Sequence, residues 1–316
     1  MKAPRVVICN AATGGGRNAL RLNYLGASRQ LTLSLPAFVR TLLHLPDRIL
    51  DLLEIASYVY AADRLTNRGA KDAVEYHGWA RSFDFHIRVR DADFWTRSDV
   101  CEQLSDLLRF MSGDKAYRFR FQPGHSTPPT SLFDTTEAVV EPPHGARVVL
   151  FSGGLDSLTG IIDLATQSQN PICLVSHESQ PGTVRTQRQL HKALIAQYSA
   201  RIQRYSFACT LHDRRSSDET QRTRMFLYGS IAAALAYSFS RSEFFVFENG
   251  ITALNLPLRQ DLINARATRT THPKSLGLLE RFLSTVWQQD FTIRSPYQWD
   301  TKTDVLQRLG ALNGRN

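Results

Sequence analysis

The sequence lacks the apolar segments that membrane proteins and secreted precursors carry. No apolar run approaches the roughly 20 residues that a membrane-spanning helix needs. The first five residues lead into only four apolar residues, at positions 6–9, which are too few for a signal peptide. We therefore expect a cytoplasmic protein with no membrane partner.

Cysteine is scarce and dispersed. The 316 residues include four cysteines, Cys9, Cys101, Cys173 and Cys209. No two of them have the CxxC spacing of zinc knuckles and redox motifs, and their wide separation does not indicate a disulfide framework. We therefore expect no zinc site in this chain, and a reducing compartment fits best.

Two common nucleotide-binding fingerprints are also missing. The chain has no glycine-rich loop that ends in Gly-Lys-Ser or Gly-Lys-Thr. The glycine run at 14–16 follows an apolar run at 6–8, but it lacks the GxGxxG spacing of a dinucleotide-binding turn. We interpret it as a flexible loop.

The composition is that of an ordinary globular protein with a basic balance. Apolar residues make up 42% of the chain, charged residues make up 21%, and the net charge is +9. The arginines are scattered rather than gathered in one run. This pattern disfavours nucleic acid as the partner, and it leaves acidic proteins and anionic small ligands open.

A stretch rich in proline, serine, threonine and glycine divides the chain. It covers residues 122–146 and predicts a linker between two domains. Residues 1–121 predict a smaller α+β domain with a strand at 31–35, a helix at 36–64, and arginine-faced strands at 83–89 and 117–121. The arginine faces lead us to expect that this domain steers an acidic partner protein; support of dimerisation or of stability is the alternative.

Residues 147–316 predict an α/β domain. Strands and helices alternate, which is typical of a parallel sheet with right-handed crossovers. The expected strands are 147–151, 171–176, 202–207 and 244–248, and the expected helices are 157–168, 183–200 and 221–241. Ligands bind such sheets at the carboxyl ends of the strands, where residues 176–178 and 248–250 fall.

The strongest motif is Ser-Gly-Gly-Leu-Asp-Ser at 152–157, directly after an apolar run at 148–151. Its glycines allow a tight turn and a close approach to a ligand. A strand, a small-residue turn and a helix aim backbone N–H groups and a positive dipole end at a phosphate. Ser152 and Ser157 add hydroxyl donors, and we expect Asp156 to meet Mg²⁺. The alternative is a glycine-rich turn that binds nothing.

Three weaker signals follow. Arg222 and Arg224 stand at a helix start, where cations oppose the dipole, so we expect an anionic partner; a solvated basic turn is the alternative. Residues 268–273 read Thr-Arg-Thr-Thr-His-Pro and form either a ligand loop or a capped turn. Lys302 begins the last expected helix and either contacts a phosphate or lies on the surface.

Together these features resemble the 7-cyano-7-deazaguanine synthases, a family of PP-loop ATP pyrophosphatases with the adenine nucleotide alpha hydrolase-like fold. The resemblance covers residues 147–310 approximately. It rests on the loop 152–157, on Arg224 before an alanine-rich helix, on residues 248–250 with 269–272, and on Thr-Lys-Thr-Asp at 301–304. The 248–250 and 268–273 segments look most like the diverged branch in anti-phage defence operons, which also has an extra N-terminal domain.

The resemblance implies ATP-dependent adenylation of 7-carboxy-7-deazaguanine and transfer to an amine, which is ammonia in the biosynthetic enzymes and a protein amine in defence relatives. It implies ATP and Mg²⁺ as cofactors. The nucleotide and pyrophosphate contacts that it implies are Ser152, Gly153, Gly154, Leu155, Asp156, Ser157, Ser176, His177 and Arg224, with Asp156 as metal ligand and Lys302 as a further catalytic residue. The implied substrate contacts are Glu248, Asn249, Arg269 and His272.

One departure from the family and two other functions bear on this interpretation. Biosynthetic members carry a four-cysteine zinc site after the Thr-Lys segment, whereas no cysteine follows Cys209 here. A tRNA-modifying PP-loop enzyme would share the loop, although thiolation usually needs paired or catalytic cysteines. A nucleotide-binding pseudo-enzyme that scaffolds a partner would share it as well, although an intact loop argues against that function.

Overall fold

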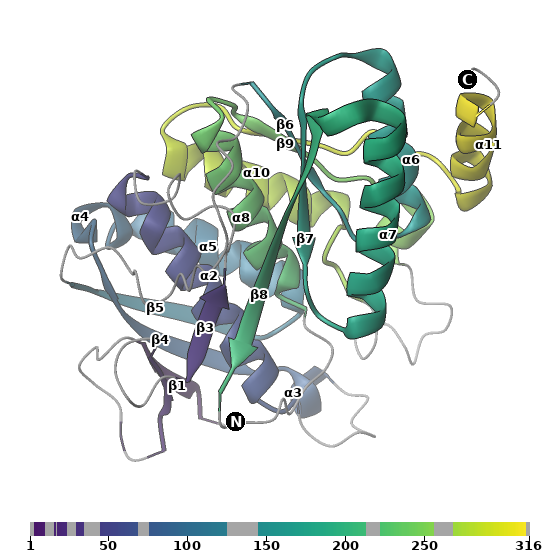
Figure 1. Ribbon diagram of the computed structural model, residues 1–316. Coiled ribbons are helices and arrows are strands. Elements are labelled where there is room, and N and C mark those ends of the chain that lie inside the picture. Colours follow the sequence, from purple (N-terminus) through teal and green to yellow (C-terminus); the bar gives the residue numbers. More distant parts are fainter. Residues whose placement is uncertain are drawn as a thin grey trace.

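The computed structural model describes residues 3–9, 16, 18–23, 30–34, 45–68, 76–124, 145–212, 222–255 and 268–313. Most of the glycine run, residues 35–44 of the predicted N-terminal elements and residues 125–144 of the predicted linker lie outside these ranges. The described chain forms two sheets with helices packed between them (Figure 1).

The first sheet is built from the N-terminal half. Its strands are β1 (Arg5–Cys9), β2 (Leu20–Leu22), β4 (Ser82–Val89) and β5 (Ala116–Pro123), in the order β2-β1-β4-β5, and every pairing is parallel. The predicted strands at 83–89 and 117–121 are confirmed. The expected α+β arrangement is wrong, because α4 (Ala92–Trp95) and α5 (Ser98–Ser112) form a helical crossover between the parallel strands β4 and β5. The short helix α3 (Tyr76–Trp79) precedes β4.

The second sheet has the order β10-β9-β6-β7-β8-β3. Its strands are β6 (Arg147–Leu150), β7 (Ile172–His177), β8 (Ile202–Leu211), β9 (Glu243–Phe245), β10 (Thr292–Arg294) and β3 (Leu31–Ser34). Only the pairing of β3 with β8 is antiparallel. The predicted parallel sheet is therefore confirmed, although β9 ends at Phe245, and the prediction included neither β10 nor the attachment of β3.

Helices cover both faces of the second sheet. Helices α6 (Leu155–Gln167) and α7 (Pro181–Tyr198) lie on one face, and α8 (Arg224–Ser238) and α10 (Pro273–Trp287) lie on the other (Figure 1). Successive side chains of β6 point to opposite faces of the sheet, so both faces are apolar and need a cover. Val149 packs in the apolar cluster that contains α6, and Val148 packs in the cluster that contains α8. Helix α11 (Lys302–Asn313) packs on α6, the 3-10 helix η1 (Ser199–Arg201) follows α7, and α9 (Gly250–Leu254) follows β9.

Helix α2 (Asp47–Leu65) joins the two halves of the molecule. Fifteen of its 19 residues are buried, and its apolar side chains share one cluster with the first sheet, α8 and α10. It packs along α8, as α5 packs along α10. Strand β3 lies before the predicted boundary in sequence but pairs beyond it, with β8. The division into two domains at 122–146 stays a prediction.

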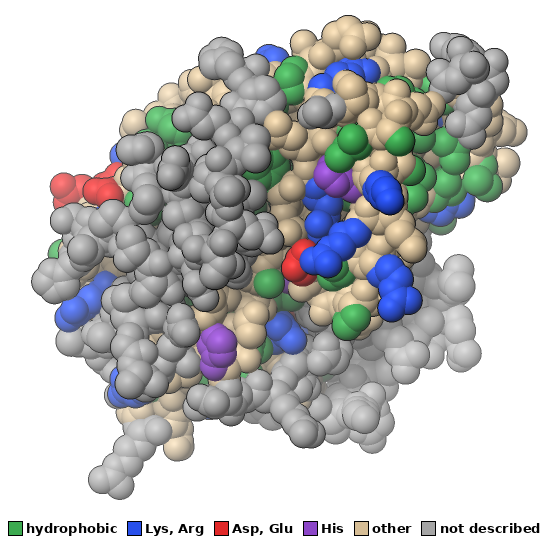
Figure 2. All heavy atoms as spheres, in the orientation of Figure 1, with side chains coloured by type: hydrophobic (Ala, Val, Ile, Leu, Met, Phe, Trp, Pro, Cys, Tyr) green, Lys and Arg blue, Asp and Glu red, His purple; other side chains and the backbone are tan. Residues whose placement is uncertain are grey.

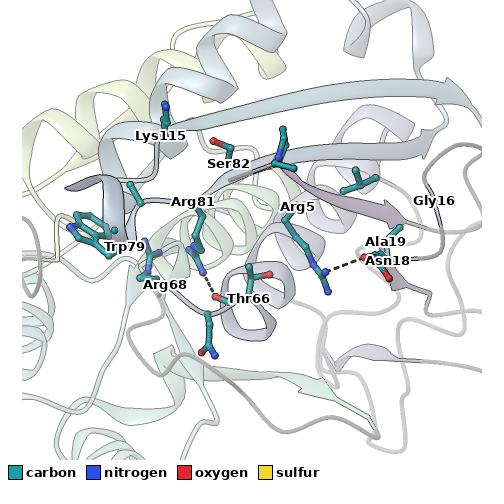
Figure 3. Close-up of a pocket in the computed structure, with 16 residues that line it drawn as sticks. Arg5, Gly16, Asn18, Ala19, Thr66, Arg68, Trp79, Arg81, Ser82 and Lys115 are labelled. Atoms are coloured by element: carbon teal, nitrogen blue, oxygen red, sulfur yellow. Dashed lines mark hydrogen bonds between the residues drawn. The ribbon is translucent and has the colours of Figure 1, made fainter. Parts of the chain in front are cut away.

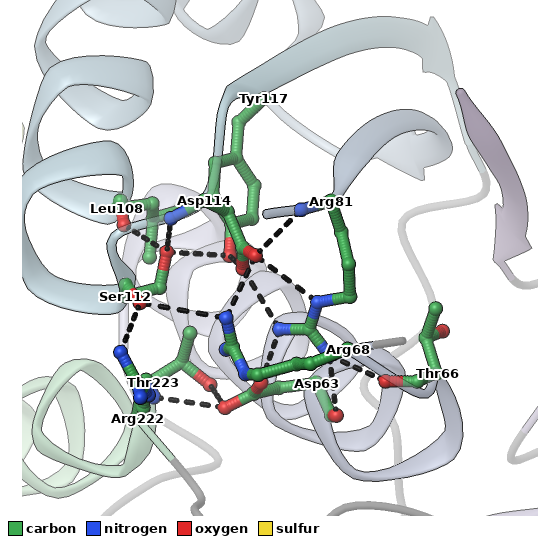
Figure 4. Close-up of polar contacts among 10 residues, drawn as sticks. All are labelled: Asp63, Thr66, Arg68, Arg81, Leu108, Ser112, Asp114, Tyr117, Arg222 and Thr223. Carbon is green, nitrogen blue, oxygen red and sulfur yellow. Dashed lines mark hydrogen bonds and ion pairs between the residues drawn. The ribbon is translucent and has the colours of Figure 1, made fainter. Parts of the chain in front are cut away.

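A network of charged side chains is buried where α2 ends. Asp63 and Asp114 form ion pairs with Arg68 and Arg81 at distances of 2.6–2.9 Å, and no side chain of the four is more than 9% exposed. Asp63 also accepts hydrogen bonds from the backbone N–H and the hydroxyl of Thr223, at 3.0 and 3.1 Å (Figure 4). Burial opposes ionisation of Asp63, but the charges of Arg81 and Arg68 lower its pKa to about 2.

Acid should therefore remove part of the stability. The folded-state pKa of Asp63 lies below the value of about 3.9 for an unfolded chain, so its ionised form stabilises the fold above about pH 4, and this contribution is lost as the pH falls toward 2. We expect the free energy of unfolding, measured by urea titration, to fall by about 2 kcal/mol through Asp63 across this window. The fall should be smaller in Asp63→Asn, and an unchanged acid dependence in that variant would contradict the assignment.

Candidate active site

The loop 152–157 lies at the carboxyl end of β6 and leads into α6. Gly153 has a φ of +82°, a left-handed conformation that glycine adopts without strain. The Ser152 hydroxyl accepts a hydrogen bond from the N–H of Gly154 and lies 3.2 Å from the Ser157 hydroxyl. Gly154 is the N-cap of α6, and no side chain caps this helix. An uncapped helix start with nearby hydroxyls is a suitable place for an anion.

Helix α7 supports this loop from one side. Gln187 donates from Nε2 to the carbonyl oxygen of Ser152 at 3.3 Å, and its Oε1 accepts a hydrogen bond from Arg204 of β8 at 3.3 Å. A Cβ atom at Gly153 would lie 3.0 Å from Cγ of Gln187. Position 153 therefore has both a conformational and a steric reason to be glycine.

Asp156, the predicted metal ligand, joins three elements of the fold. Its Oδ1 accepts a hydrogen bond from Lys302 Nζ at 2.6 Å, and its Oδ2 accepts from the side-chain amide and the backbone N–H of Asn249 at 2.7 and 3.2 Å. Burial opposes ionisation, but the hydrogen bonds from Lys302 and Asn249 lower the pKa of Asp156. The carboxylate thus connects the start of α6 to the segment after β9 and to the first residue of α11.

Thr301 and Asp304 cap α11 next to Lys302. The Asp304 carboxylate accepts hydrogen bonds from the backbone N–H and hydroxyl of Thr301, and the N–H of Asp304 donates to the Thr301 hydroxyl. This reciprocal arrangement is a capping box. The Thr-Lys-Thr-Asp segment therefore has a structural role, and it also brings Lys302 to Asp156.

A cavity of about 310 Å³ opens beside the loop. Its walls include the hydroxyl-bearing Ser152 and Ser157, together with His177, Arg224 and Glu248. The volume is at the lower end of the range for small-molecule sites, roughly 300–1,000 Å³. Since β6 and β7 both end here, the cavity occupies the place where parallel sheets bind ligands.

The environment of His177 on the cavity wall is aromatic. The hydroxyl of Tyr228 forms a 2.7 Å hydrogen bond with His177 Nδ1, and the ring of Tyr60, from α2, lies edge-on with its centroid 6.2 Å away. Burial and the positive charges of Arg64 and Arg224 lower the pKa of His177 to about 4. The imidazole is therefore neutral at pH 7, and only its Nε2 is left to meet a ligand.

Two opposite charges face the same cavity. Arg224 is the first residue of α8 and is exposed, and Glu248 follows β9. Burial and the negative charge of Asp156 raise the pKa of Glu248. A cation suited to phosphate and a carboxyl group that holds a proton more readily than usual therefore meet at one place.

Several predicted residues lie near the cavity without lining it. Ser176 alternates with Val175 and His177 along β7, and these two neighbours line the cavity, so Ser176 points to the opposite face, where it is fully buried. Other predicted residues absent from the walls are Gly153, Gly154, Leu155, Asp156, Asn249 and Lys302. Three of these, Asp156, Asn249 and Lys302, are joined by hydrogen bonds.

The predicted substrate contacts Arg269 and His272 both meet Phe110 of α5. Arg269 lies 5.1 Å from the centroid of the Phe110 ring, and His272 lies edge-on to that ring at 5.3 Å. His272 also caps α10 by accepting a backbone hydrogen bond at Nδ1. The two residues between them, Thr270 and Thr271, line the cavity. The predicted loop is therefore at the site, but Thr270 and Thr271 line the cavity instead of Arg269 and His272.

The sequence interpretation also missed several residues of the wall, among them Thr183, Gln187, Tyr228 and Phe247. Helical spacing could have found Tyr228, because it lies four residues after Arg224 and therefore on the same helix face. Thr183 and Gln187 share a face in the same way, but neither was predicted. No such signal precedes Phe247, whose position depends on packing against α6.

The described residues fit Mg²⁺ only in combination with a phosphate ligand. In nucleotide sites this ion usually takes one or two carboxylates together with phosphate oxygens. Glu248 provides a carboxyl group on the wall, whereas both oxygens of Asp156 already accept hydrogen bonds. Across the described ranges, no group of three or more His, Cys, Asp or Glu side chains is placed to hold a metal ion. Phosphate oxygens would have to complete the coordination.

The environments of the four cysteines disfavour the reactive thiolate form. All four are free, and burial raises the pKa of each thiol, that of Cys209 to about 12. None is among the described residues that line the cavity. Since the thiolate is the reactive form, these thiols do not support a nucleophilic role at the site.

A second cavity, of about 660 Å³, lies at the amino ends of the first sheet's strands (Figure 3). Arg5, Arg68, Arg81 and Lys115 line it. Arg68 and Arg81 are bound to the buried carboxylates described above, and Arg5 donates to the carbonyl oxygen of Asn18 at 3.0 Å. These three cations already have partners in the fold, so we assign the candidate site to the smaller cavity, which adjoins the loop.

No protein-family model matches this chain, and neither a similar curated protein nor a similar solved structure was found. The fold and site define an α/β protein with a glycine-containing strand-to-helix loop at the carboxyl edge of a mostly parallel sheet. Among the described helices, none is long and apolar enough to cross a membrane.

Gly160 should tolerate no side chain. It lies in α6 against the ring of Phe247, and a Cβ atom there would come within 2.1 Å of that ring. We expect Gly160→Ala to lower the free energy of unfolding by about 1–3 kcal/mol, because the ring would have to move. Gly277→Ala is the matched control, since nothing lies within 4 Å of its Cβ position. Urea denaturation that gave both variants equal stability would contradict this packing.

Proposed function

We propose that this protein is an ATP-dependent carboxylate–amine ligase that forms an acyl-adenylate at the loop 152–157. The observation that carries the proposal is the loop itself. Ser152 and Ser157 line one cavity, and the left-handed Gly153 and the uncapped start of α6 lie between these two serines in the loop. Preorganised donors of this kind stabilise negative charge as it develops on a leaving group.

The proposed reaction has two steps. A carboxylate oxygen of the substrate attacks the α-phosphorus of ATP, the bond from that phosphorus to the bridging oxygen breaks, and pyrophosphate leaves. An amine then attacks the acyl carbon and loses a proton, and AMP leaves. The loop and Arg224 hold the pyrophosphate, and Glu248, whose pKa is raised, lies on the wall of the same cavity, where it can exchange a proton with the reacting groups. Bound Mg²⁺ would neutralise phosphate charge.

The substrate that we propose is 7-carboxy-7-deazaguanine, on the basis of the sequence resemblance. In support, the loop, Arg224, Glu248 and the threonines of the 268–273 segment gather around a single cavity. The aromatic surroundings of His177 suit a planar heterocycle. ATP-dependent chemistry of this kind fits the cytoplasm.

No observation favours the two other functions to the same degree. The raised pKa values of the thiols do not support sulfur transfer to tRNA. A nucleotide-binding scaffold without turnover would share the loop, and release of pyrophosphate distinguishes it from an enzyme.

Ser152→Ala tests the proposed function. We expect pyrophosphate release from ATP, Mg²⁺ and 7-carboxy-7-deazaguanine to fall by about 100-fold or more, because one preorganised donor is lost. The melting temperature should stay unchanged, since Ser152 is exposed. Ser168→Ala, at the opposite end of α6, is the control and should retain turnover. A rate of pyrophosphate release equal to that of wild type in Ser152→Ala would contradict the proposal.

We also propose a macromolecular amine as the acceptor, guided by a basic face of α7. This helix exposes Arg185, Arg188 and Lys192 and contains no acidic residue, and Figure 2 shows cationic side chains gathered over it. Thr183 and Gln187 of the same helix line the cavity. A basic surface beside the site would attract an acidic protein over a distance, and salt would weaken this attraction.

Charge reversal tests the acceptor surface. Arg185→Glu combined with Lys192→Glu should reduce modification of an acidic protein from the same operon by about tenfold at low salt and leave pyrophosphate release unchanged. Arg109→Glu combined with Arg118→Glu, at two exposed positions of the N-terminal half, is the matched control, because it changes the net charge by the same amount. Mass spectrometry of the partner gives the readout, and equal effects of the two reversals would contradict the proposal. Point variants are preferable to removal of residues 1–121, which would take α2 from α8 and β3 from β8.

A further inference from the structure

The start of α8 is held by the other half of the molecule. Thr223 is the N-cap residue of α8, yet its side chain caps no N–H group of its own helix. Its hydroxyl and its backbone N–H both donate to Oδ2 of Asp63, at 3.1 and 3.0 Å (Figure 4). The carboxylate at this helix start therefore comes from α2, more than 150 residues earlier in the chain.

This carboxylate is fixed in place from every side. Asp63 is 1% exposed. Its Oδ1 accepts hydrogen bonds from Arg81 at 2.6 Å and from Arg68 at 2.9 Å, while its Oδ2 accepts the two from Thr223. A negative charge at a helix N-terminus is favourable, and here it offsets the unfavourable cation that begins α8, Arg224.

Arg222 anchors the same turn a second time. Its guanidinium lies 4.9 Å from the centroid of the Trp79 ring and donates to the carbonyl oxygen of Ser112 at 3.3 Å. Positions 222 and 223 are thus both bound to the N-terminal half, and the next residue, Arg224, lines the candidate cavity. Consecutive Cα atoms are about 3.8 Å apart, so a shift of Thr223 passes directly to Arg224.

We propose that Asp63 is a positioning residue for Arg224: by holding Thr223, it sets where the guanidinium of Arg224 meets a phosphate in the cavity. This inference rests on the proposed function, because the phosphate contact of Arg224 is part of it. Asp63 touches no substrate and acts only through the first turn of α8. A misplacement on the order of 1 Å is enough to impair such a contact.

The chain offers a matched control for this role. Asp114 is buried in the same network, pairs with the same two arginines, and receives further hydrogen bonds from the backbone of Arg81 and from Tyr117. None of its hydrogen bonds among the described residues comes from α8. Asp63→Asn and Asp114→Asn should therefore destabilise the fold in similar ways, and only Asp63→Asn should disturb Arg224.

The experiment measures binding of Mg²⁺-pyrophosphate and of Mg²⁺-ATP by calorimetry, at a temperature where circular dichroism shows every variant folded. We expect Asp63→Asn and Arg224→Ala each to weaken binding about tenfold, as the loss or misplacement of one charge-assisted hydrogen bond would. Asp114→Asn should bind within about twofold of wild type. In the double variant Asp63→Asn with Arg224→Ala, binding should equal that of Arg224→Ala alone, because both changes act through one contact.

A milder pair keeps the test valid if Asp63→Asn does not fold. Thr223→Val removes only the hydroxyl and keeps the shape, whereas Thr223→Ser keeps the hydroxyl. The valine variant should bind Mg²⁺-pyrophosphate more weakly than wild type, and the serine variant should bind it as wild type does.

Two results would overturn the inference alone: equal weakening by Asp63→Asn and Asp114→Asn, or a further loss when Asp63→Asn is added to Arg224→Ala. A wild-type protein that binds neither Mg²⁺-ATP nor Mg²⁺-pyrophosphate would overturn the proposed function as well.

Discussion

A buried carboxylate needs donors, and Asp63 receives them from three separate stretches of the chain. Arg68 follows α2, Arg81 precedes β4, and Thr223 precedes α8. An ion taken from water into a protein interior loses several kcal/mol of hydration unless partners replace it. The two halves can bury these charges only in the one arrangement that brings all the donors together. The contacts that the candidate site receives from the first half depend on that arrangement.

The two halves contribute different things to the site. The second sheet supplies the loop, because its parallel strands end at one edge and α6 begins there with an uncapped turn. The first half supplies support from behind α8: Tyr60 lies beside His177, and Phe110 holds the segment that contains Thr270. The cavity is therefore lined by one half and braced by the other. Because α2 packs between the first sheet and α8, it is buried on almost all sides.

Asp156 shows how a motif residue can acquire a second role. Its place in the loop predicted a metal ligand, and its hydrogen bonds instead join Asn249 and Lys302. Both of these partners had been predicted as site residues on separate grounds. The three residues are thus brought together as expected, but they bind one another, while Glu248 is the carboxyl group on the wall. A metal ion at Asp156 would share this carboxylate with the ammonium group of Lys302, since each carboxylate oxygen has two lone pairs.

Local patterns in the sequence were sufficient for the loop, for the parallel core of the second sheet and for most of its helices. The period of apolar residues and the spacing of motif residues are properties of neighbouring positions. The glycine at 153 likewise predicted a tight turn, in which its φ is left-handed. The same patterns could not distinguish α+β from α/β in the first half, because a strand alternates in the same way whether its neighbour is parallel or antiparallel.

Tertiary structure alone decided the pairing of β3 with β8, the turn of Arg269 toward Phe110 and the contact between Asp63 and Thr223. The last of these joins residues 160 positions apart. No local periodicity specifies such a contact, since it depends on which buried charges can find donors once both halves have packed.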